Sequence, residues 1–448
     1  MMGTMIRPAP LALEKPHGPW SCRGCDIWDT LSAARDGDVA ALRALLEQDP
    51  NLYRAEYWYT QPIHFAVREG HVGALRVLLD AGADPAWVGL EREDLATVAR
   101  DRGHTEVAQL LETRRSRPSR VEPAGSPAVE SPIHAAAESG DVERVRALLD
   151  ADQELVKASD GDGRSPLSRA ATTSSREVVA LLLERGADPN WSDDPGAPRG
   201  AALHTASRAG DVALVELLLA HGADPNATID SAGSATYAAA TPELRALLVA
   251  NGGRLNPYDL VWLGEHDEVL RRVTADPESA HEGCGGVLAA ACTLGKRDLV
   301  VRLLEAGVRV PPVLTECRSY LWGDPDLLRL LLDSGMDPDL PDWQCATPLH
   351  SLCQCDRRGR PRPHHIECAD MFLEAGATLS ARDSEYRSTP LGWAARNGLA
   401  DMVVWLLERG APVELADDEP WATPLAWATR RGHPEIAERL ETGAQPTP

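Results

Sequence analysis

Apolar residues recur along the chain in short runs, and each of several runs ends at a glycine. The runs Leu75–Ala81, Val178–Leu183 and Leu214–Ala220 carry apolar residues at spacings of three and four, which predicts short helices. Each run leads into the same four residues, Gly-Ala-Asp-Pro, at 82–85, 186–189 and 222–225. Because glycine readily adopts the left-handed conformation that follows a helix, these glycines mark helix ends. The pattern predicts a chain of short helices joined by tight turns.

A second landmark is a phrase of the form X-Pro-Leu/Ile-X-X-Ala, which marks helix starts. It occurs at residues 61–66, 131–136, 165–170, 389–394 and 423–428. Proline in the first helical turn loses no needed N–H and presets φ, so it begins a helix. A Gly-Asp or Gly-His pair follows, as at Gly140-Asp141 and Gly432-His433, and separates this helix from the next. The prolines Pro132 and Pro166 are 34 residues apart, as are Pro390 and Pro424, so the unit is a repeated helix–turn–helix.

This period and phrase resemble the ankyrin repeat, whose signature reads Thr-Pro-Leu-His-x-Ala. The resemblance covers residues 26–445 and implies an all-α solenoid of helix–turn–helix repeats with short finger turns. A single unit cannot bury its apolar faces, whereas stacked neighbours can. Clear units begin near Trp28, Gln61, Ser131, Ser165, Ala201, Thr347, Thr389 and Thr423, and weaker ones lie at Glu93–Glu112, Ala235–Gly253, Tyr258–Pro277, Val287–Val308 and Glu316–Met336. The resemblance further implies protein recognition along the concave face that fingers and first helices form.

The chain is expected to divide at changes in composition and at degraded repeats. Residues 113–130 are rich in Arg, Ser and Pro and lack periodicity, which is typical of a linker between subarrays. The stretches Thr236–Leu248 and Tyr258–Val273 are short for a helix pair, so irregular stacking is expected there. The expected divisions are a Pro-rich leader at 1–25, repeats at 26–112, the linker at 113–130, central repeats at 131–257, degenerate repeats at 258–343 and further repeats at 344–445. The last group contains an insertion at 356–363 and ends in a C-terminal cap.

Charge and composition narrow the class of partner. The 448 residues include 45 basic and 68 acidic side chains, which leaves a net charge of −23. Such a charge repels nucleic-acid phosphate and anionic lipid, so a protein partner with a basic surface is favoured. There is no apolar run of membrane-spanning length and no signal-peptide core. Nine cysteines lie mostly in helical patterns, which favours reduced thiols in a cytoplasmic protein.

Enzyme signatures are absent, so no catalytic residue, cofactor or metal is assigned. The sequence has no phosphate-binding glycine loop, no His-Glu-x-x-His and no nucleophile elbow. One alternative is a zinc-binding or thiol-reactive module, because seven thiols and imidazoles gather at Cys345, His350, Cys353, Cys355, His364, His365 and Cys368. Against it, the region lacks a paired Cys-x-x-Cys, and Cys353 stands where repeats bury a small residue. Core cysteines are favoured, and the lone pair Cys22 and Cys25 lacks a second pair for zinc.

Aromatic residues give a stronger indication of function than the cysteines and histidines do. The chain has two Phe but twelve Trp and seven Tyr, and several of them fall in finger segments that usually hold small polar residues. Exposed Trp and Tyr are enriched at binding hot spots. The predicted partner-binding residues are Tyr57, Trp58, Tyr59, Trp191, Trp343, Tyr386 and Trp421, with Trp87 in a similar place. The alternative is that each ring packs on a neighbouring finger, and a purely structural spacer would have no partner.

Other aromatic and imidazole side chains fit structural roles. Trp393, Trp405 and Trp427 follow the helical period, which predicts that they lie in the core. In the ankyrin repeat, the histidine in the fourth position of the phrase resembles a hydrogen-bonding link between adjacent repeats. That position is held by His64, His134, His204 and His350.

Overall fold

The structure, a computed structural model, describes residues 5–12, 14, 22–58, 60–88, 93–116, 131–160, 164–190, 201–227, 233–282, 285–310, 324–355, 360–361 and 363–443. Over these residues the regular structure is helical, with isolated bridges such as Tyr57 with Thr60. None of the described helices is long and apolar enough to cross a membrane. The chain forms two compact units. We call Ala9–Leu255 the N-terminal unit, and Asn256–Pro448 together with Met1–Pro8 the C-terminal unit.

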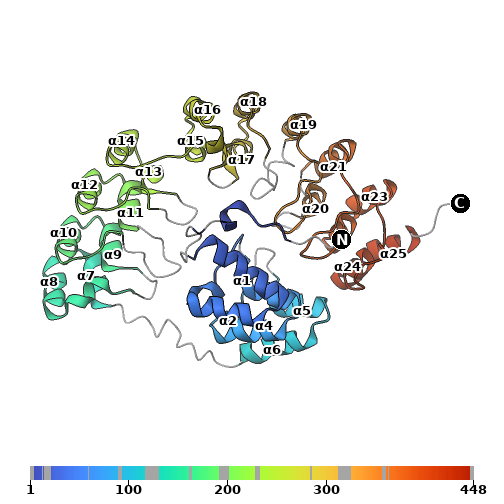
Figure 1. Ribbon diagram of the computed structural model, residues 1–448, viewed down its shortest axis with the longest axis horizontal. Coiled ribbons are helices and arrows are strands. Elements are labelled where there is room, and N and C mark those ends of the chain that lie inside the picture. The colour runs from blue at the N-terminus through green and yellow to red at the C-terminus, as the bar shows by residue number, and fades with distance from the viewer. Residues whose placement is uncertain are drawn as a thin grey trace. The chain divides into compact units, whose positions relative to one another are not determined.

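The N-terminal unit contains helix pairs in two runs, one before and one after residues 117–130, and within each run first helices pack beside first helices (Figure 1). The first helices are α1 (Gly24–Asp36), α3 (Pro62–Arg68), α5 (Leu95–Asp101), α7 (Pro132–Ser139), α9 (Pro166–Thr172), α11 (Ala201–Ala209) and α13 (Ala235–Ala238). The second helices are α2 (Val39–Gln48), α4 (Val72–Asp80), α6 (Thr105–Ser116), α8 (Val142–Ala151), α10 (Arg176–Glu184), α12 (Val212–Ala220) and α14 (Pro242–Ala250). Short 3-10 turns are η1 (Ala9–Ala12), η2 (Pro50–Tyr53) and η3 (Gln153–Lys157).

The C-terminal unit continues the same helix-pair pattern. Its first helices are α15 (Pro257–Leu263), α17 (Gly286–Thr293), α20 (Pro348–Leu352), α22 (Pro390–Arg396) and α24 (Pro424–Arg431). Its second helices are α16 (His266–Ala275), α18 (Arg297–Glu305), α19 (Pro325–Asp333), α21 (His365–Glu374), α23 (Ala400–Glu408) and α25 (Pro434–Gly443), and a 3-10 turn, η5 (Pro277–His281), follows α16. The all-α solenoid predicted from the repeat is confirmed.

Helix starts and turns follow the sequence landmarks. Proline occupies the first turn of α22 and α24, where the side chain of Thr423 accepts a hydrogen bond from the amide of Ala426 at 3.2 Å. The turn after α22 uses Gly398 at φ +72°. A Cβ there would lie 2.6 Å from the ring of His433, so both the backbone angle and the close approach require glycine. The landmarks therefore fix where each helix pair begins and turns.

Second helices start on polar caps, of which Asp211 is an example. Its side chain accepts a hydrogen bond from the amide of Leu214 at 3.1 Å and pairs with Arg176 at 2.6 Å in the preceding repeat. Burial of the Asp211 carboxyl raises its pKa, but these hydrogen bonds lower the pKa by more, so it lies below its ordinary value. One carboxylate thus caps α12 and ties it to α10.

Replacing Asp211 by alanine is expected to lower the free energy of unfolding by about 1 kcal/mol, because an N-cap is lost. The contribution of Asp211 is present above about pH 4, near the unfolded-state pKa of Asp, and is lost as pH falls through the depressed native pKa. Urea denaturation of wild type and Asp211→Ala at neutral and acidic pH checks this. Asp211→Asn, which keeps a capping oxygen, is the control. A difference between wild type and Asp211→Ala that does not shrink in acid would contradict it.

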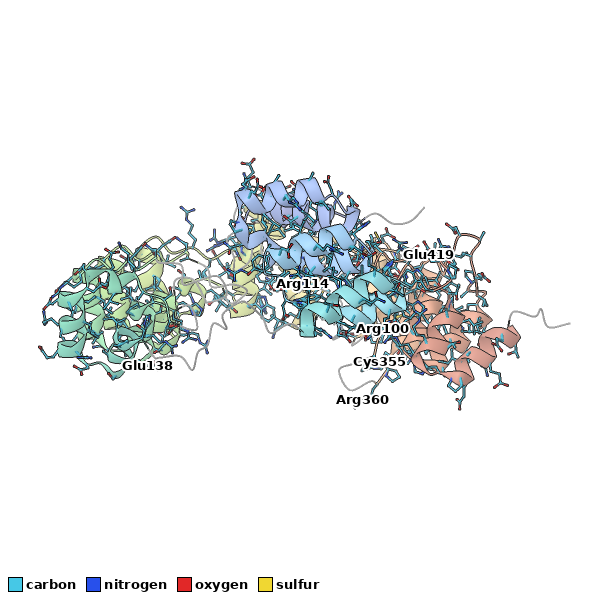
Figure 2. The ribbon with its side chains drawn as sticks, turned by 90° about the horizontal axis from the view of Figure 1, so that it is seen from below. Arg100, Arg114, Glu138, Cys355, Arg360 and Glu419 are labelled. Carbon is cyan, nitrogen blue, oxygen red and sulfur yellow. The ribbon has the colours of Figure 1, made fainter. Side chains whose placement is uncertain are left out.

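The end of one helix differs from the sequence expectation. Helix α6 runs to Ser116 rather than ending before residue 113, because Arg114 pairs with Asp80 at 2.6 Å and holds the last turn on α4 (Figure 2). The division between the two units falls between Leu255 and Asn256, after α14, close to the expected boundary between central and degenerate repeats. The linker at 113–130 stays a prediction, because residues 117–130 lie outside the described residues.

The expected leader, 1–25, is also more structured than its proline content suggests. Helix α1 already begins at Gly24, and Leu11 in η1 is fully buried. Residues Met5–Pro8 belong to the C-terminal unit, where the amide of Ile6 donates to the carbonyl of Trp343 at 2.9 Å. Nothing in the local sequence pattern specifies such a long-range contact.

Candidate protein-binding surface

The finger turns are closed by aspartate side chains that bond to the turn's own backbone. In the finger before α20, Asp342 accepts hydrogen bonds from the amides of Gln344 and Ala346, both at 2.8 Å. The carbonyl of Gln344 in turn accepts from the amide of Ser384 in the next finger at 2.7 Å. This folded turn places the Trp343 side chain in the core, with 5% of its surface exposed.

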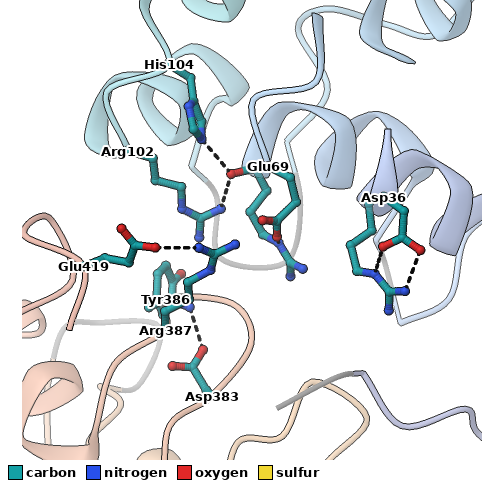
Figure 3. Close-up of polar contacts among 10 residues, drawn as sticks. Asp36, Glu69, Arg102, His104, Asp383, Tyr386, Arg387 and Glu419 are labelled. Atoms are coloured by element: carbon teal, nitrogen blue, oxygen red, sulfur yellow. Dashed lines mark hydrogen bonds and ion pairs between the residues drawn. The ribbon is translucent and has the colours of Figure 1, made fainter. Parts of the chain in front are cut away.

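The next finger repeats this arrangement around a second buried aspartate. Asp383 accepts from the amides of Tyr386 at 2.6 Å and Ser388 at 3.0 Å, and from the indole Nε1 of Trp393 at 3.0 Å. Arg387 takes a positive φ of 49° and pairs with Glu419 of the following finger at 3.1 Å (Figure 3). The turn therefore points Tyr386 inward and leaves Arg387 to link two fingers.

Four aromatic rings from these repeats stack edge to face within the C-terminal unit. Tyr386 contacts Trp393 and Trp427 at centroid distances of 5.2 and 5.5 Å, and Trp421 contacts Trp427 at 6.0 Å. The guanidinium of Arg396 lies 4.1 Å from the Tyr386 ring. Such edge-to-face pairs and cation–π contacts add to the burial of the rings. The burial predicted for Trp393, Trp405 and Trp427 is confirmed.

The seven predicted binding residues separate by exposure. Tyr57, Trp343 and Tyr386 are 5, 5 and 4% exposed, so these three rings are packed within the array. Their fingers fold back on themselves and on neighbouring repeats, as the packing alternative supposed. Trp58 and Trp421 are half-buried and keep exposed surface. Tyr59 and Trp191 lie outside the described residues. No observation tests whether any of the seven contacts a partner.

The finger of Trp58 shows why its ring stays accessible. Tyr57 and Thr60 exchange both backbone hydrogen bonds, at 3.2 and 3.1 Å, which closes a tight hairpin. Trp58 sits at its tip with φ +50°, an angle that non-glycine residues rarely adopt. At this position the indole is half-buried and keeps some exposed surface. Trp87, also half-buried, lies 5.8 Å from the ring of His64.

One exposed aromatic residue was missed from the sequence. Trp262 on α15 is 40% exposed and lies in a first helix rather than in a finger. A signal for it was present, because Trp262 stands two residues before Gly264, the glycine that ends the helix. Arg68, Arg396 and Arg430 hold the same place before Gly70, Gly398 and Gly432. A tryptophan where other repeats carry arginine marks an unusual surface position.

Two histidines of the repeated phrase form links between adjacent repeats. The Nε2 atoms of His134 and His350 lie 2.8 and 3.0 Å from the carbonyls of Arg164 and Ser388 in the next repeats, which confirms their structural role. Burial lowers the pKa of His134. A second link joins α3 to the following repeat, where Arg102 donates to the carbonyl of Arg68 at 3.1 Å and His104 lies 3.2 Å from it (Figure 3).

The thiols and imidazoles of residues 345–368 are held by separate partners. The Nδ1 of His350 accepts a hydrogen bond from the amide of Thr347 at 3.0 Å, and His365 pairs with Asp401 at 2.9 Å. Cys355, at the start of the insertion, lies 3.6 Å from the carbonyl of Asn397. Burial raises the pKa of Cys353 well above its usual range, and that of Cys368 to about 12, so both thiols stay protonated.

These separate contacts leave little support for a zinc site. Over the part of the chain that the structure describes, no three His, Cys, Asp or Glu side chains converge as a metal site would require. Part of the expected insertion, residues 356–359 and 362, lies outside the described residues. Cys355 and Arg360, on either side of the first stretch, are described (Figure 2).

Comparison with known families decides the identity of the repeat. Residues 95–193, 317–417 and 364–447 match the description "Ankyrin repeats (3 copies)", residues 31–79 match "Ankyrin repeats (many copies)", and residues 201–230 match "Ankyrin repeat". Together these matches cover more than half of the chain. The chain belongs to the ankyrin repeat family. The resemblance seen in the repeated phrase is thereby confirmed.

Several known proteins are similar in sequence to parts of this ankyrin repeat protein. It is 36% identical over 121 residues to "Probable E3 ubiquitin-protein ligase XBOS33" of Oryza sativa subsp. japonica, over 27% of this chain and 23% of that protein. It is 40% identical over 78 residues to "Ankyrin repeat and SOCS box protein 16" of Homo sapiens, over 17% of this chain and 16% of that protein. The human ASB11 ankyrin repeat domain aligns with 50% of this chain and 98% of its own at 24% identity and a TM-score of 0.23. The chain thus spans about a quarter or less of the two sequence relatives.

Proposed function

We propose that this ankyrin repeat protein is a non-enzymatic scaffold or adaptor that binds a protein partner along its fingers and first helices. The observation that carries the proposal is a repeat array with half-buried tryptophans, Trp58 and Trp421, on its finger turns. Such rings bury a large area on binding and lose few rotamers, which is why they anchor interfaces. Tyr59 and Trp191 extend the proposed surface by their sequence positions alone.

A partner with a basic surface is the best match in charge. The net charge of −23 gives the protein an acidic field that attracts cations and repels nucleic acid and anionic membranes. The nine cysteines lie mostly in helical patterns rather than at the spacings of a disulfide framework, which favours a cytoplasmic location. The relatives named as ligases align over less than a quarter of their own length, so their named activity is not part of this proposal. The zinc alternative has less support, because its candidate ligands have separate partners.

The electrostatic part of the proposal predicts a salt-dependent interaction. Capture of partner proteins on the immobilised full chain should weaken steeply between about 0.05 and 0.5 M salt. Added salt shortens the Debye length and so screens the attraction between the acidic chain and a basic partner. Recovery of each captured protein would be measured across this range, together with its isoelectric point. Selective capture of acidic proteins, or recovery that salt does not change, would contradict a basic partner. Absence of any selective capture would contradict the scaffold function itself.

A further inference from the structure

An aromatic pair lies on α15 of the C-terminal unit, with Trp262 exposed and Tyr258 half-buried. Tyr258 and Trp262 are one helical turn apart, with ring centroids 6.2 Å from each other and an interplanar angle of 57°. Leu260 and Val261 on the opposite side of the helix are buried and hold α15 in the core. Trp262 is the one aromatic side chain, of those described, with more than a third of its surface exposed. The pair therefore stands on a helix that is already fixed by packing.

The equivalent place in three other repeats pairs a cation with an aromatic ring. Of the arginines that stand two residues before a glycine at the end of a first helix, three pack their guanidinium on a ring. They are Arg68 on Phe65 at 4.6 Å, Arg396 on Tyr386 at 4.1 Å and Arg430 on Trp427 at 4.7 Å. In α15 this place holds Trp262 itself, whose ring contact within the described structure is with Tyr258. The α15 repeat thus supplies two rings where these three repeats supply a ring and a cation.

Two acidic residues lie on or beside the helix that carries the pair. Asp259 lies between the two aromatic residues in sequence, and Glu282 directly follows η5, which packs against α15. Burial raises the pKa of the Asp259 carboxyl, and the negative charge of Glu282 raises it further. Among the described residues, no Lys or Arg pairs with either of them. Exposed Glu265 adds a third negative charge after the end of the helix.

We infer that Trp262 and Tyr258, with Asp259 and Glu282, receive an arginine side chain from a basic segment of the protein partner. The inference rests on the proposed function and adds the chemistry recognised at one place on the surface. A guanidinium over the Trp262 face gains cation–π attraction, and its N–H groups can donate to the carboxylates. The negative charges of Asp259 and Glu282 also favour a cationic ligand over a neutral one.

The test is a titration of the full chain with a blocked peptide of alternating arginine and glycine, measured by calorimetry. Trp262→Ala is expected to weaken binding about threefold to tenfold, whereas Trp262→Phe keeps a ring and most of the affinity. Glu282→Gln is expected to weaken binding less and to reduce its salt dependence. Val249→Ala, at a valine that is 49% exposed on α14, is the matched control and should bind like wild type.

Equal affinity of wild type and Trp262→Ala, with circular dichroism unchanged, would overturn the inference. So would a wild type that binds the arginine peptide no more tightly than a peptide of alternating glutamate and glycine. Neither result touches the proposed function, which fails only if the chain captures no partner selectively. A captured partner that Trp262→Ala retains fully would refute this site and leave the scaffold function standing.

Discussion

Replacing Trp427 by alanine is expected to lower the free energy of unfolding of the C-terminal repeats by about 3–5 kcal/mol. The side chain is 1% exposed and contacts the rings of Tyr386 and Trp421. Three guanidinium groups, of Arg396, Arg430 and Arg431, lie 4.7–5.7 Å from its centroid. Alanine would leave a cavity between α22 and α24 and remove all these contacts together. Urea denaturation followed by circular dichroism measures the loss.

Two further variants separate packing from other effects of the Trp427 substitution. No described residue accepts a hydrogen bond from Nε1 of Trp427, so Trp427→Phe loses no hydrogen bond and should cost much less than alanine. Val249→Ala, on an exposed face of α14, should change stability by less than about 0.5 kcal/mol. Because repeats contact only their neighbours, hydrogen exchange should accelerate most in α22, α24 and α25. Unchanged exchange there would contradict the role given to the ring.

Alanine at Trp58 or Trp421 should weaken partner binding, each by about 2 kcal/mol or roughly thirtyfold if the ring is a hot spot. Both side chains are half-buried, so each has a fixed orientation and still offers surface to a partner. Neither substitution should unfold the array, because Trp58 sits at a hairpin tip and Trp421 at the edge of the aromatic stack. Phenylalanine at the same positions should keep part of the affinity.

The repeat pattern predicted the fold well because it reports local chemistry. Proline at a first turn and glycine at a helix end act through their own backbone, so Pro390 and Gly398 bound α22 without reference to distant residues. The helical period likewise predicted the burial of Trp393 and Trp427. The contact of Ile6 with Trp343 could not be predicted, since it joins residues far apart in sequence.

Exposure of the finger aromatics depends on turn geometry, which residue type alone does not specify. Asp342 and Asp383 close their turns through backbone amides and so rotate Trp343 and Tyr386 into the core. Trp58 stays half-buried at the tip of its hairpin, where φ is positive. Trp262 lies in a first helix, outside the fingers where the sequence predicts binding aromatics, although its place before a helix-ending glycine distinguishes it from the arginines of several other repeats.

The central claim is that finger tryptophans bind a protein partner, and one measurement tests it most directly. The affinity of a purified captured partner would be measured by calorimetry for wild type and for the Trp58→Ala, Trp421→Ala double variant, with Val249→Ala as control. We predict a loss of more than about thirtyfold for the double variant and none for the control, with circular dichroism unchanged in both. Equal affinity of the folded double variant and wild type would contradict it.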